Sequence, residues 1–395
     1  MPETGVTAKG GAKVRVLVLA GWYPNSRNTV KGVFVQEQAL ALQEAGLETI
    51  VFYPFDEEVA PGKTAAERKD GLQVYRANSN QGRNPYWARI CSYGRTLRII
   101  RQLVARHRPD IIHVHVGYPA AIIAWLYTRY APIPYVITEH MSYLQDYVAK
   151  WQHRVLLKAA FERAALVLPV SRSLQDQIRN FGWKTSLRVV PNVVDIDLFQ
   201  LNAQPGAQRL PSAALKILFV GGMEETQVKG LNYLLPAFAQ VVRKIPRQVE
   251  LHLIGDGPRR QHYQNMAEEL GISSCCTFYG QIEHQAMPAY YSQSDFLVLS
   301  SLKETFGCVL VEAMASGKPV VATACGGPED IVTEEVGLLV KPGDIEALTQ
   351  GILRMIASLP AYRPEVIREY ARQKYSRAVI AQTMREIYQG LQGST

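Results

Sequence analysis

Short apolar runs alternate with longer stretches of helical periodicity, and this alternation limits the possible folds more than any other feature of the chain. In the first half, the apolar runs lie at 14–19, 49–53, 111–115, 135–138 and 166–170. Continuous apolar runs of this length are typical of strands that are buried on both faces of a parallel sheet. Since parallel strands need a crossover between them, the sequence predicts βαβ units in a doubly wound α/β sheet.

The alternation stops near residue 201 and starts again after residue 212. The segment in between, LNAQPGAQRLPS, is rich in Pro, Gly and small polar residues, which is typical of a linker between domains. New apolar runs follow at 216–220, 249–254, 276–279, 296–300 and 319–323. We therefore expect a flexible tail at 1–12 and two similar α/β domains, at 13–205 and 206–372, that face each other across a cleft.

Composition narrows the class of protein. Hydrophobic residues make up 47% of the chain and charged residues 20%, as in a folded globular enzyme. No apolar run approaches the roughly 20 residues of a membrane-spanning helix, and the N-terminus lacks the apolar core of a signal peptide. The cysteines are odd in number and have no metal-ligand spacing, so we expect reduced thiols in the cytoplasm. The net charge of +8 favours an anionic partner, but no nucleic-acid motif accompanies it.

Two glutamates eight positions apart, Glu304 and Glu312, stand in the segment ETFGCVLVE. The run from Glu304 to Thr323 predicts a turn, a helix, a tight Gly turn and a buried strand. On this helix the two carboxylates would lie about 12 Å apart along the axis and point to similar sides, one at the helix mouth and one near its middle. That spacing suits a grip on the hydroxyl groups of a long ligand, such as a nucleotide sugar. The alternative is an amphipathic helix with solvated acids.

Glycines and a lysine follow the first two strands of the second half. Lys229 and Gly230 precede a helical segment at 231–242, where a cation and the helix N-terminus could neutralise a phosphate. A solvated surface lysine is the alternative. Gly255-Asp-Gly-Pro258 follows a strand, and this turn would let main chain approach a ligand, although the same residues also make ordinary turns.

Together these segments resemble the retaining glycosyltransferases of family 4, which have the GT-B fold. The resemblance rests on Glu304-x7-Glu312, Gly255-Asp-Gly-Pro258, Lys229-Gly230 and the segment VPNVVD at 190–195, in this order and at these intervals. It runs from Val14 to about Tyr388. It implies two tandem Rossmann-like domains and a C-terminal helix, at 373–395, that packs back on the first domain.

The resemblance also implies a nucleoside-diphosphate sugar, with a UDP-sugar favoured, bound to the second domain. Glu312 would bind the ribose hydroxyls, Glu304 the hydroxyls of the donor sugar, and Lys229 the diphosphate. Main-chain amides of Phe306 and Gly307 would contact the sugar or the diphosphate. The remaining donor-site residues, with the last two near the base, are Gly222, Gly255, Val309, Gln281 and Ile282.

One position departs from the family pattern. Gly222 stands where the family usually has an arginine next to the glycine that ends the first strand of the second domain. Either another cation substitutes for that arginine, or Lys229 and helix dipoles alone stabilise the leaving diphosphate.

The first domain supplies further candidates. Gly21 and Gly32 bound a loop that in the family faces the cleft and touches donor phosphate or acceptor; the alternative is a surface loop with turn glycines. His140 matches the family's histidine near the reacting sugar, so the expected catalytic set is Glu304, His140 and Lys229. His113 and His115 face one side of a strand, and we expect them to be structural or cleft-lining rather than metal ligands. No metal ion or cofactor is expected.

The segment at 71–109 contains eight arginines and no acidic residue. From Arg83 to Arg108, apolar and basic residues interleave as in a basic amphipathic helix that could meet an anionic membrane or an anionic acceptor. The alternative, favoured for the apolar stripe, is packing against the first sheet.

We therefore expect a retaining hexosyltransferase that moves a sugar to a hydroxyl acceptor, with a lipid-linked acceptor as one option, in polysaccharide or glycolipid synthesis. The protein would be cytoplasmic or peripheral at the inner membrane face. The alternatives are an inactive nucleotide-sugar-binding partner subunit and a GT-B-fold nucleotide-sugar epimerase. The donor sugar, acceptor, linkage and oligomeric state stay open.

Overall fold

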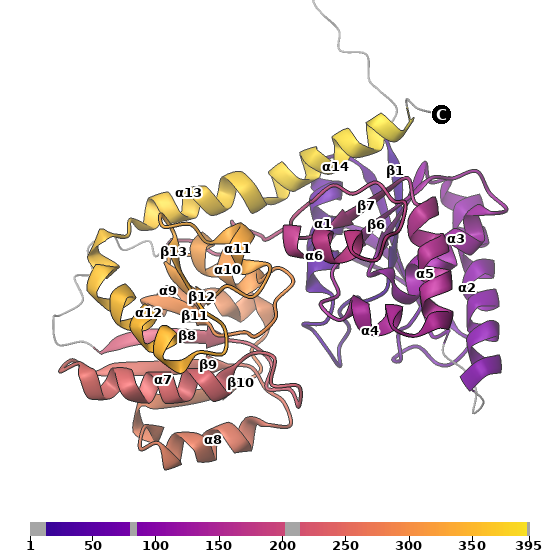
Figure 1. Ribbon diagram of the computed structural model, residues 1–395. Helices are drawn as coiled ribbons and strands as arrows, with labels where there is room; N and C mark the ends of the chain where they lie inside the picture. The colour runs from indigo at the N-terminus through magenta and orange to yellow at the C-terminus, as the bar shows by residue number, and fades with distance from the viewer. Residues whose placement is uncertain (1–12, 80–84, 202–213, 393–395) are drawn as a thin grey trace, which may run out of the picture.

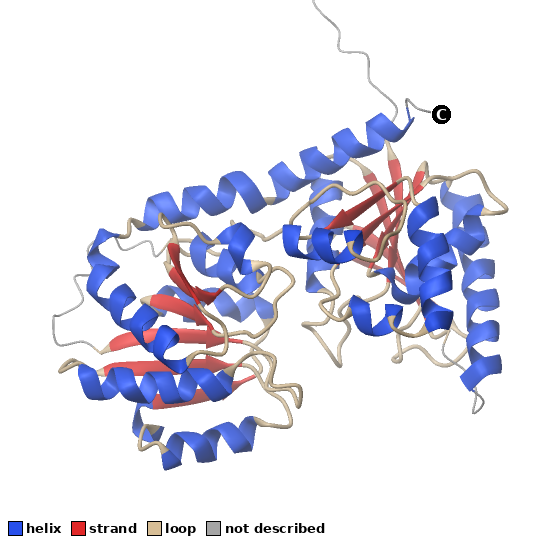
Figure 2. Cartoon of the chain, in the orientation of Figure 1, coloured by secondary structure: helices blue, strands red, loops and turns tan. Residues whose placement is uncertain are grey.

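The computed structural model describes residues 13–79, 85–201 and 214–392. They form two α/β domains, and a pair of C-terminal helices runs across both of them (Figure 1). In each domain a central sheet lies between layers of helices (Figure 2). The expected tail at 1–12, the expected boundary at 205/206 and Arg83 lie outside the described residues.

The sheet of the first domain has seven strands in the order β3-β4-β2-β1-β5-β6-β7. All neighbouring pairs are parallel except β3 and β4. The strands are β1 Arg15–Ala20, β2 Glu48–Tyr53, β3 Thr64–Lys69, β4 Leu72–Ala77, β5 Ile111–His115, β6 Tyr135–Glu139 and β7 Leu166–Pro169. The sequence prediction missed β3, because it is a fully exposed edge strand with polar and small side chains and thus has no apolar run. It also missed β4, whose sequence LQVYRA mixes apolar and polar residues.

The sheet of the second domain is entirely parallel, in the order β10-β9-β8-β11-β12-β13. Its strands are β8 Leu215–Val220, β9 Val249–Ile254, β10 Cys276–Gly280, β11 Phe296–Leu299, β12 Val320–Thr323 and β13 Gly337–Val340. The predicted runs match β8 to β12 within one residue at each end. The prediction missed β13, an edge strand of four residues that is only partly buried.

Helices connect the strands and cover both faces of each sheet. In the first domain they are α1 Val33–Glu44, α2 Pro85–His107, α3 Gly117–Thr128, α4 Leu144–Val148, α5 Trp151–Arg163 and α6 Arg172–Arg179. The helices of the second domain and the C-terminal pair are α7 Leu231–Lys244, α8 Arg260–Glu269, α9 Met287–Gln293, α10 Cys308–Ala315, α11 Pro328–Ile331, α12 Ile345–Ser358, α13 Pro364–Tyr375 and α14 Arg377–Gln392. Short 3-10 turns lie at η1 Ser273–Cys275, η2 His284–Ala286 and η3 Leu359–Ala361.

The C-terminal helix α14 returns to the first domain, as the resemblance implied (Figure 1). Its apolar face, which includes Ile380, Met384 and Tyr388, shares a buried cluster with Val35 and Leu42 of α1. Because α13 packs against α10 while α14 packs against α1, one continuous stretch of chain ties the two domains together.

The apolar stripe of α2 packs inward. Ile99, Ile100 and Leu103 belong to the buried core of the first domain, whereas Arg98 and Arg101 are exposed. The structure therefore agrees with the packed-stripe alternative for this helix, and the side chains before residue 92 lie outside the description. Among the described residues, we find no helix that combines the length and the apolar character needed to span a bilayer.

Candidate active site

The two charged residues expected at the donor, Lys229 and Glu304, form an ion pair. Lys229 lies after β8, just before α7, and its Nζ is 2.6 Å from Oε2 of Glu304, which follows β11. Burial disfavours the charge of Lys229, but the Glu304 carboxylate outweighs this effect and raises the lysine pKa. The fold thus brings a cation and a carboxylate together at the carboxyl ends of two adjacent strands.

The predicted geometry of the glutamate pair is wrong, because α10 begins only at Cys308. Gly307 precedes the helix in a left-handed conformation, with φ of 99°, and separates Glu304 from it. Glu304 instead pairs through its main chain with the loop after β12: its N–H donates to Cys325, and its carbonyl accepts from Gly327 at 2.8 Å. The side chain of Glu304 is therefore positioned by a main-chain bridge rather than by a helix.

Glu312 does lie on α10, and it is almost completely buried. Its Oε2 accepts a hydrogen bond of 2.6 Å from the hydroxyl of Tyr291, and its Oε1 lies 3.6 Å from Nε2 of His284. Burial opposes protonation of His284, but the neighbouring Glu312 carboxylate raises the histidine pKa. The sequence prediction missed both partners, since a lone Tyr on α9 and a lone His in the short turn η2 carry no distinctive spacing.

The loops after β8 and β9 approach each other so closely that a glycine is needed. Gly255 has φ of 131°, and a Cβ at this position would lie 2.0 Å from the carbonyl oxygen of Gly221. Gly222 is not crowded in this way: a Cβ there would meet only the carboxylate of Glu224, at 3.3 Å. The position of the expected arginine is thus open, and an acidic side chain lies beside it.

The other expected donor residues surround these loops. Phe306 is buried, Gly307 caps α10, and Val309 and Ile282 are half-buried, whereas Gln281 is exposed. The carbonyl of Gly280, one residue before Gln281, accepts a hydrogen bond of 2.8 Å from the N–H of Gly255.

In the first domain, His140 belongs to a buried cluster of three histidines. Nε2 of His140 lies 3.1 Å from Nδ1 of His115, whose ring lies 4.1 Å from that of His113. His113 is held by the hydroxyls of Thr138 and of Tyr388 on α14, each at 2.6 Å from a ring nitrogen. The cluster links the C-terminal helix to the strand ends of the first sheet.

Burial sets the charge of this cluster. It lowers the pKa of His113 and His140 well below the usual range and that of His115 to about 3. It also raises the pKa of Glu139 to about 7, although main-chain N–H groups of Met141, Gly117 and His140 oppose the rise. His140 is therefore neutral at pH 7, and its ring can exchange hydrogen bonds without carrying a charge.

Gly21 and Gly32 hold the loop after β1 against the end of β5. The N–H of Gly21 donates to His115, and a Cβ at Gly21 would lie 2.9 Å from the Cβ of Val116. Gly32 has φ of 81°, and a Cβ there would lie 2.6 Å from the main chain of Trp22 and Tyr23. A side chain at either position would clash with neighbouring residues, which explains why both are glycine. Both glycines keep this loop beside the histidine cluster.

Asn192 joins the two halves of the site. It stands in the segment VPNVVD, which the sequence analysis quoted for the resemblance without giving the residue a role. Its side chain hydrogen-bonds to His140, and this contact partly offsets the lowering of the His140 pKa by burial. Its Nδ2 lies 3.6 Å from Sγ of Cys308 at the start of α10. The first domain therefore meets the N-terminus of α10 close to His140.

Within residues 13–79, 85–201 and 214–392, no group of three or more His, Cys, Asp or Glu side chains is arranged to hold a metal ion. The expectation that the reaction needs no metal or cofactor stays a prediction.

Two Rossmann-like domains, bridged by a returning C-terminal helix and carrying charged groups at strand ends, have the GT-B fold. A family model described as Glycosyltransferase Family 4 matches residues 32–198, and one described as Glycosyl transferases group 1 matches residues 202–374. The chain belongs to the family 4 glycosyltransferases.

One curated relative agrees with this family, and two solved structures share the fold. A Bacillus subtilis glycosyltransferase assigned to teichuronic acid biosynthesis, TuaC, is 27% identical over 370 residues, which cover 86% of this chain and 89% of the relative. The sucrose-phosphate synthase of Thermosynechococcus elongatus has the same fold, with a TM-score of 0.79 and 24% identity over 97% of this chain and 100% of that one. HepE of Anabaena, solved with UDP and glucose, has a TM-score of 0.72 and 21% identity over 95% of this chain and 100% of HepE.

Proposed function

We propose that this protein is a retaining glycosyltransferase that moves a hexose from a nucleoside-diphosphate sugar, with a UDP-sugar favoured, to a hydroxyl group of an acceptor. The observation that carries the proposal is the ion pair of Lys229 and Glu304, fixed at 2.6 Å at the strand ends of the second domain. A nucleoside-diphosphate sugar offers both groups a partner, because its diphosphate is anionic and its sugar hydroxyls can donate to a carboxylate. The shared fold with HepE, which was solved with UDP and glucose, supports this class of donor.

Each donor residue has a role that follows from its surroundings. Lys229 and the N-terminus of α10 would stabilise the diphosphate, and Glu304 would hold the donor sugar. Glu312 would bind the ribose, because each carboxylate oxygen has two lone pairs and keeps one after its contact with Tyr291 or His284.

The chemical step then needs few groups from the protein. The bond between the sugar's anomeric carbon and the diphosphate oxygen breaks, and the electron pair leaves with the diphosphate. The acceptor oxygen forms the new bond on the same face, and its proton passes to a phosphate oxygen of the leaving group. Lys229 stabilises the growing negative charge, and the neutral ring of His140 orients a sugar hydroxyl.

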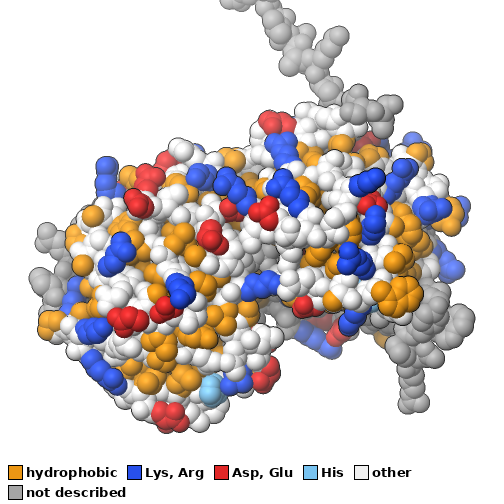
Figure 3. Space-filling view, in the orientation of Figure 1, with side chains coloured by type: hydrophobic (Ala, Val, Ile, Leu, Met, Phe, Trp, Pro, Cys, Tyr) orange, Lys and Arg blue, Asp and Glu red, His pale blue; other side chains and the backbone are white. Residues whose placement is uncertain are grey.

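The acceptor side is also part of the proposal. TuaC is assigned to teichuronic acid biosynthesis, and by analogy this chain would act in polysaccharide or glycolipid synthesis. The exposed arginines of α2, together with the net charge of +8, would allow a peripheral contact with an anionic membrane and a lipid-linked acceptor there. On the face drawn in Figure 3, basic side chains are spread over both domains with acidic ones among them.

One observation favours a second candidate, an inactive nucleotide-sugar-binding partner subunit. The carboxylate of Glu224 lies beside Gly222, where the family places a cation, and a negative charge there weakens the hold on a diphosphate.

A thermal-shift screen followed by a hydrolysis assay separates the two candidates. A nucleotide sugar that binds the folded state raises Tm, and the panel identifies base and sugar together. An active transferase slowly releases the nucleoside diphosphate from the sugar that stabilises it. Stabilisation without release would favour the inactive partner, and the absence of both would contradict the donor site.

A further inference from the structure

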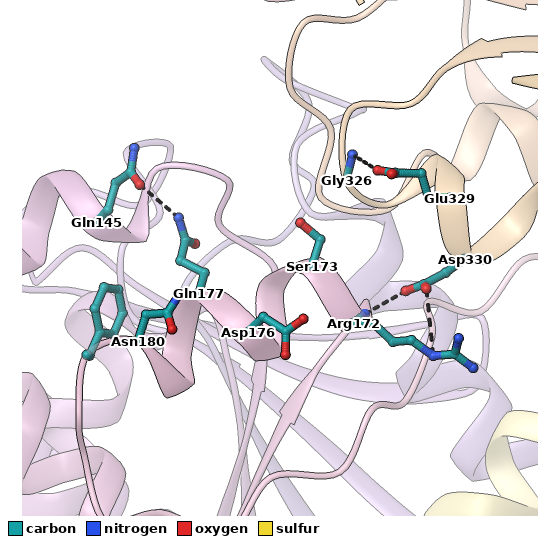
Figure 4. Close-up of a pocket in the computed structure, with 10 residues that line it drawn as sticks. Gln145, Arg172, Ser173, Asp176, Gln177, Asn180, Gly326, Glu329 and Asp330 are labelled. Atoms are coloured by element: carbon teal, nitrogen blue, oxygen red, sulfur yellow. Dashed lines mark hydrogen bonds and ion pairs between the residues drawn. The ribbon is translucent and has the colours of Figure 1, made fainter. Parts of the chain in front are cut away.

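A cavity of about 730 Å³ lies between the two domains, beside the donor-site residues rather than among them. One wall is α6 and the neighbouring α4 of the first domain, and the opposite wall is the segment from Gly326 to Asp330 that follows β12 (Figure 4). β7 of the first sheet precedes α6, and β12 of the second sheet precedes the segment from Gly326 to Asp330. The cavity therefore lies at the carboxyl ends of one strand from each sheet, where ligands of open α/β sheets bind.

The lining has the chemistry of a carbohydrate site. Side-chain amides of Gln145, Gln177 and Asn180 line the first-domain wall, and Nε2 of Gln177 donates to Oε1 of Gln145 at 3.0 Å. Each amide both donates and accepts, as does a sugar hydroxyl. Phe181 adds a half-buried aromatic ring, which can pack against the C–H groups of a sugar.

The charges of the lining argue against an anionic ligand. Arg172 is the one cation among the lining residues, and its main-chain N–H and guanidinium both contact the carboxylate of Asp330, at 2.5 and 3.8 Å. Asp176 pairs with Arg179, which does not line the cavity, at 3.1 Å, and Glu329 accepts from the N–H of Gly326. Acidic groups therefore outnumber the cation, and a phosphate or uronate would be repelled.

The second-domain wall is continuous with the donor site. Gly326 forms a main-chain bridge with Glu304, the residue proposed to hold the donor sugar. The same glycine touches the first domain, because a Cβ on it would lie 3.0 Å from Oγ of Ser173 on α6. One main-chain bridge therefore joins the cavity wall to the segment that carries Glu304.

We propose that this cavity binds the sugar acceptor, and that the acceptor residue seated there is an uncharged or amino sugar rather than a phosphorylated or uronic one. The inference rests on the proposed transfer function and specifies its acceptor. The expected ligand is polyhydroxylated, exchanges hydrogen bonds with the amides of α4 and α6, and presents a hydroxyl toward Glu304.

The test measures binding of three nitrophenyl glycosides, a glucoside, a glucosaminide and a glucuronide, by saturation-transfer NMR on the full chain with UDP present. We expect the first two to bind and the glucuronide to bind at least about tenfold more weakly. Asn180→Trp, an exposed position that fills the cavity, should abolish binding without changing Tm or donor hydrolysis.

A second part of the test reverses the charge of one acidic lining residue. Asp176→Lys should improve glucuronide binding about fivefold, whereas Glu268→Lys, an exposed acid on α8 outside the lining, should not. The inference is overturned if none of the three glycosides binds, if binding survives Asn180→Trp, or if the glucuronide binds as tightly as the glucoside. Donor hydrolysis by the wild type separates this result from a failure of the proposed transfer function, since hydrolysis needs no acceptor.

Discussion

At the scale of single residues, the ion pair of Lys229 and Glu304 connects sequence to chemistry most directly. Its 2.6 Å contact pre-positions both side chains, so less conformational entropy is lost when a donor binds. It also means that neither group acts independently. A change at Glu304 alters the charge balance at Lys229, and the kinetics of variants must be interpreted with that coupling in mind.

Glu304→Gln is expected to lower kcat about 10- to 100-fold while the KM for the donor changes little. An amide oxygen is a weaker acceptor for the sugar hydroxyls than a charged carboxylate, whereas Lys229 remains available to the diphosphate. Steady-state assays of donor hydrolysis and transfer measure this split. Glu312→Gln serves as the contrast, because loss of a ribose contact should mainly raise the donor KM. Near-wild-type transfer by Glu304→Gln would show that this carboxylate does not hold the sugar.

Gly222→Arg is expected to raise donor affinity about fivefold, since it restores a cation beside the proposed diphosphate. The backbone permits the change, because the added Cβ would meet only the flexible side chain of Glu224. Isothermal titration with UDP provides the measurement, and Gly222→Gln, of similar length but uncharged, is the control. Unchanged affinity in Gly222→Arg would place the diphosphate elsewhere.

At the scale of secondary-structure elements, the anchor of α14 decides how the domains are held. Arg377, the first residue of α14, contacts Glu37 of α1 at 2.7 Å, Asp195 at 3.0 Å and Glu44 at 2.6 Å. Glu37 is buried, and burial raises its pKa even with Arg377 present. A single guanidinium therefore compensates a carboxylate that the core of the first domain would otherwise leave unpaired.

Arg377→Met should destabilise the protein by about 2–4 kcal/mol, because it leaves the buried carboxylate of Glu37 without a partner. Urea unfolding followed by circular dichroism measures the loss. Arg372→Met is the matched control: this arginine pairs with Glu369 on the exposed face of α13, and its removal should not change the midpoint measurably. An equal effect of the two substitutions would mean that the Glu37 pair contributes nothing specific.

The arginines Arg98, Arg101 and Arg106 of α2 are exposed, whereas its apolar stripe is buried. If it meets a membrane, the contact is electrostatic, so flotation with anionic vesicles should fall sharply between low and physiological salt. Neutral vesicles are the control. Replacing Arg98, Arg101 and Arg106 by Gln should abolish flotation, and equal flotation with neutral vesicles would argue against this surface.

At the scale of the whole molecule, the buried titratable groups set the pH dependence of stability. In the folded protein, the pKa values of His113, His115 and His140 lie below their usual 6.5, so these side chains bind protons only after unfolding. Glu139 has the opposite sign, because its pKa is raised from 4.5 to about 7 and it releases a proton on unfolding between those values. For these four groups the sum is a net uptake of about two protons on unfolding between about pH 4.5 and 6.5, and the raised pKa of Glu37 reduces this uptake at the acid end of the range.

Stability should therefore fall as the pH drops below 6.5, by up to about 2.7 kcal/mol per pH unit for two protons. Urea unfolding at half-unit intervals from pH 7 to pH 5 measures the slope. His262→Gln changes an exposed histidine outside the cluster and should leave the slope unaltered. A free energy of unfolding that stays constant over this range would contradict the buried, neutral state of the three rings.

Much of the fold was predictable because buried parallel strands have a strong local signal. The runs at β1, β2 and β5 to β12 are mainly apolar, and their boundaries were found within a residue or so. The exposed β3, the mixed apolar and polar sequence of β4 and the short β13 have no such signal. The prediction placed Glu304 at the start of the helix, but α10 begins at Cys308. Gly307 ends the preceding loop in a left-handed conformation, which the apolar residues around it do not reveal.

Three features could be derived from the order of the amino acids alone: two parallel α/β domains in tandem, the family to which they belong and the positions that follow their strands. These features depend on local periodicity and on short segments in fixed order. Three contacts became visible only in the folded chain: Lys229 pairs with Glu304, Asn192 reaches both His140 and Cys308, and Tyr388 bonds to His113, 275 positions away. The physical reason is that each of these contacts joins segments far apart in the chain, and their distances are fixed by packing rather than by spacing.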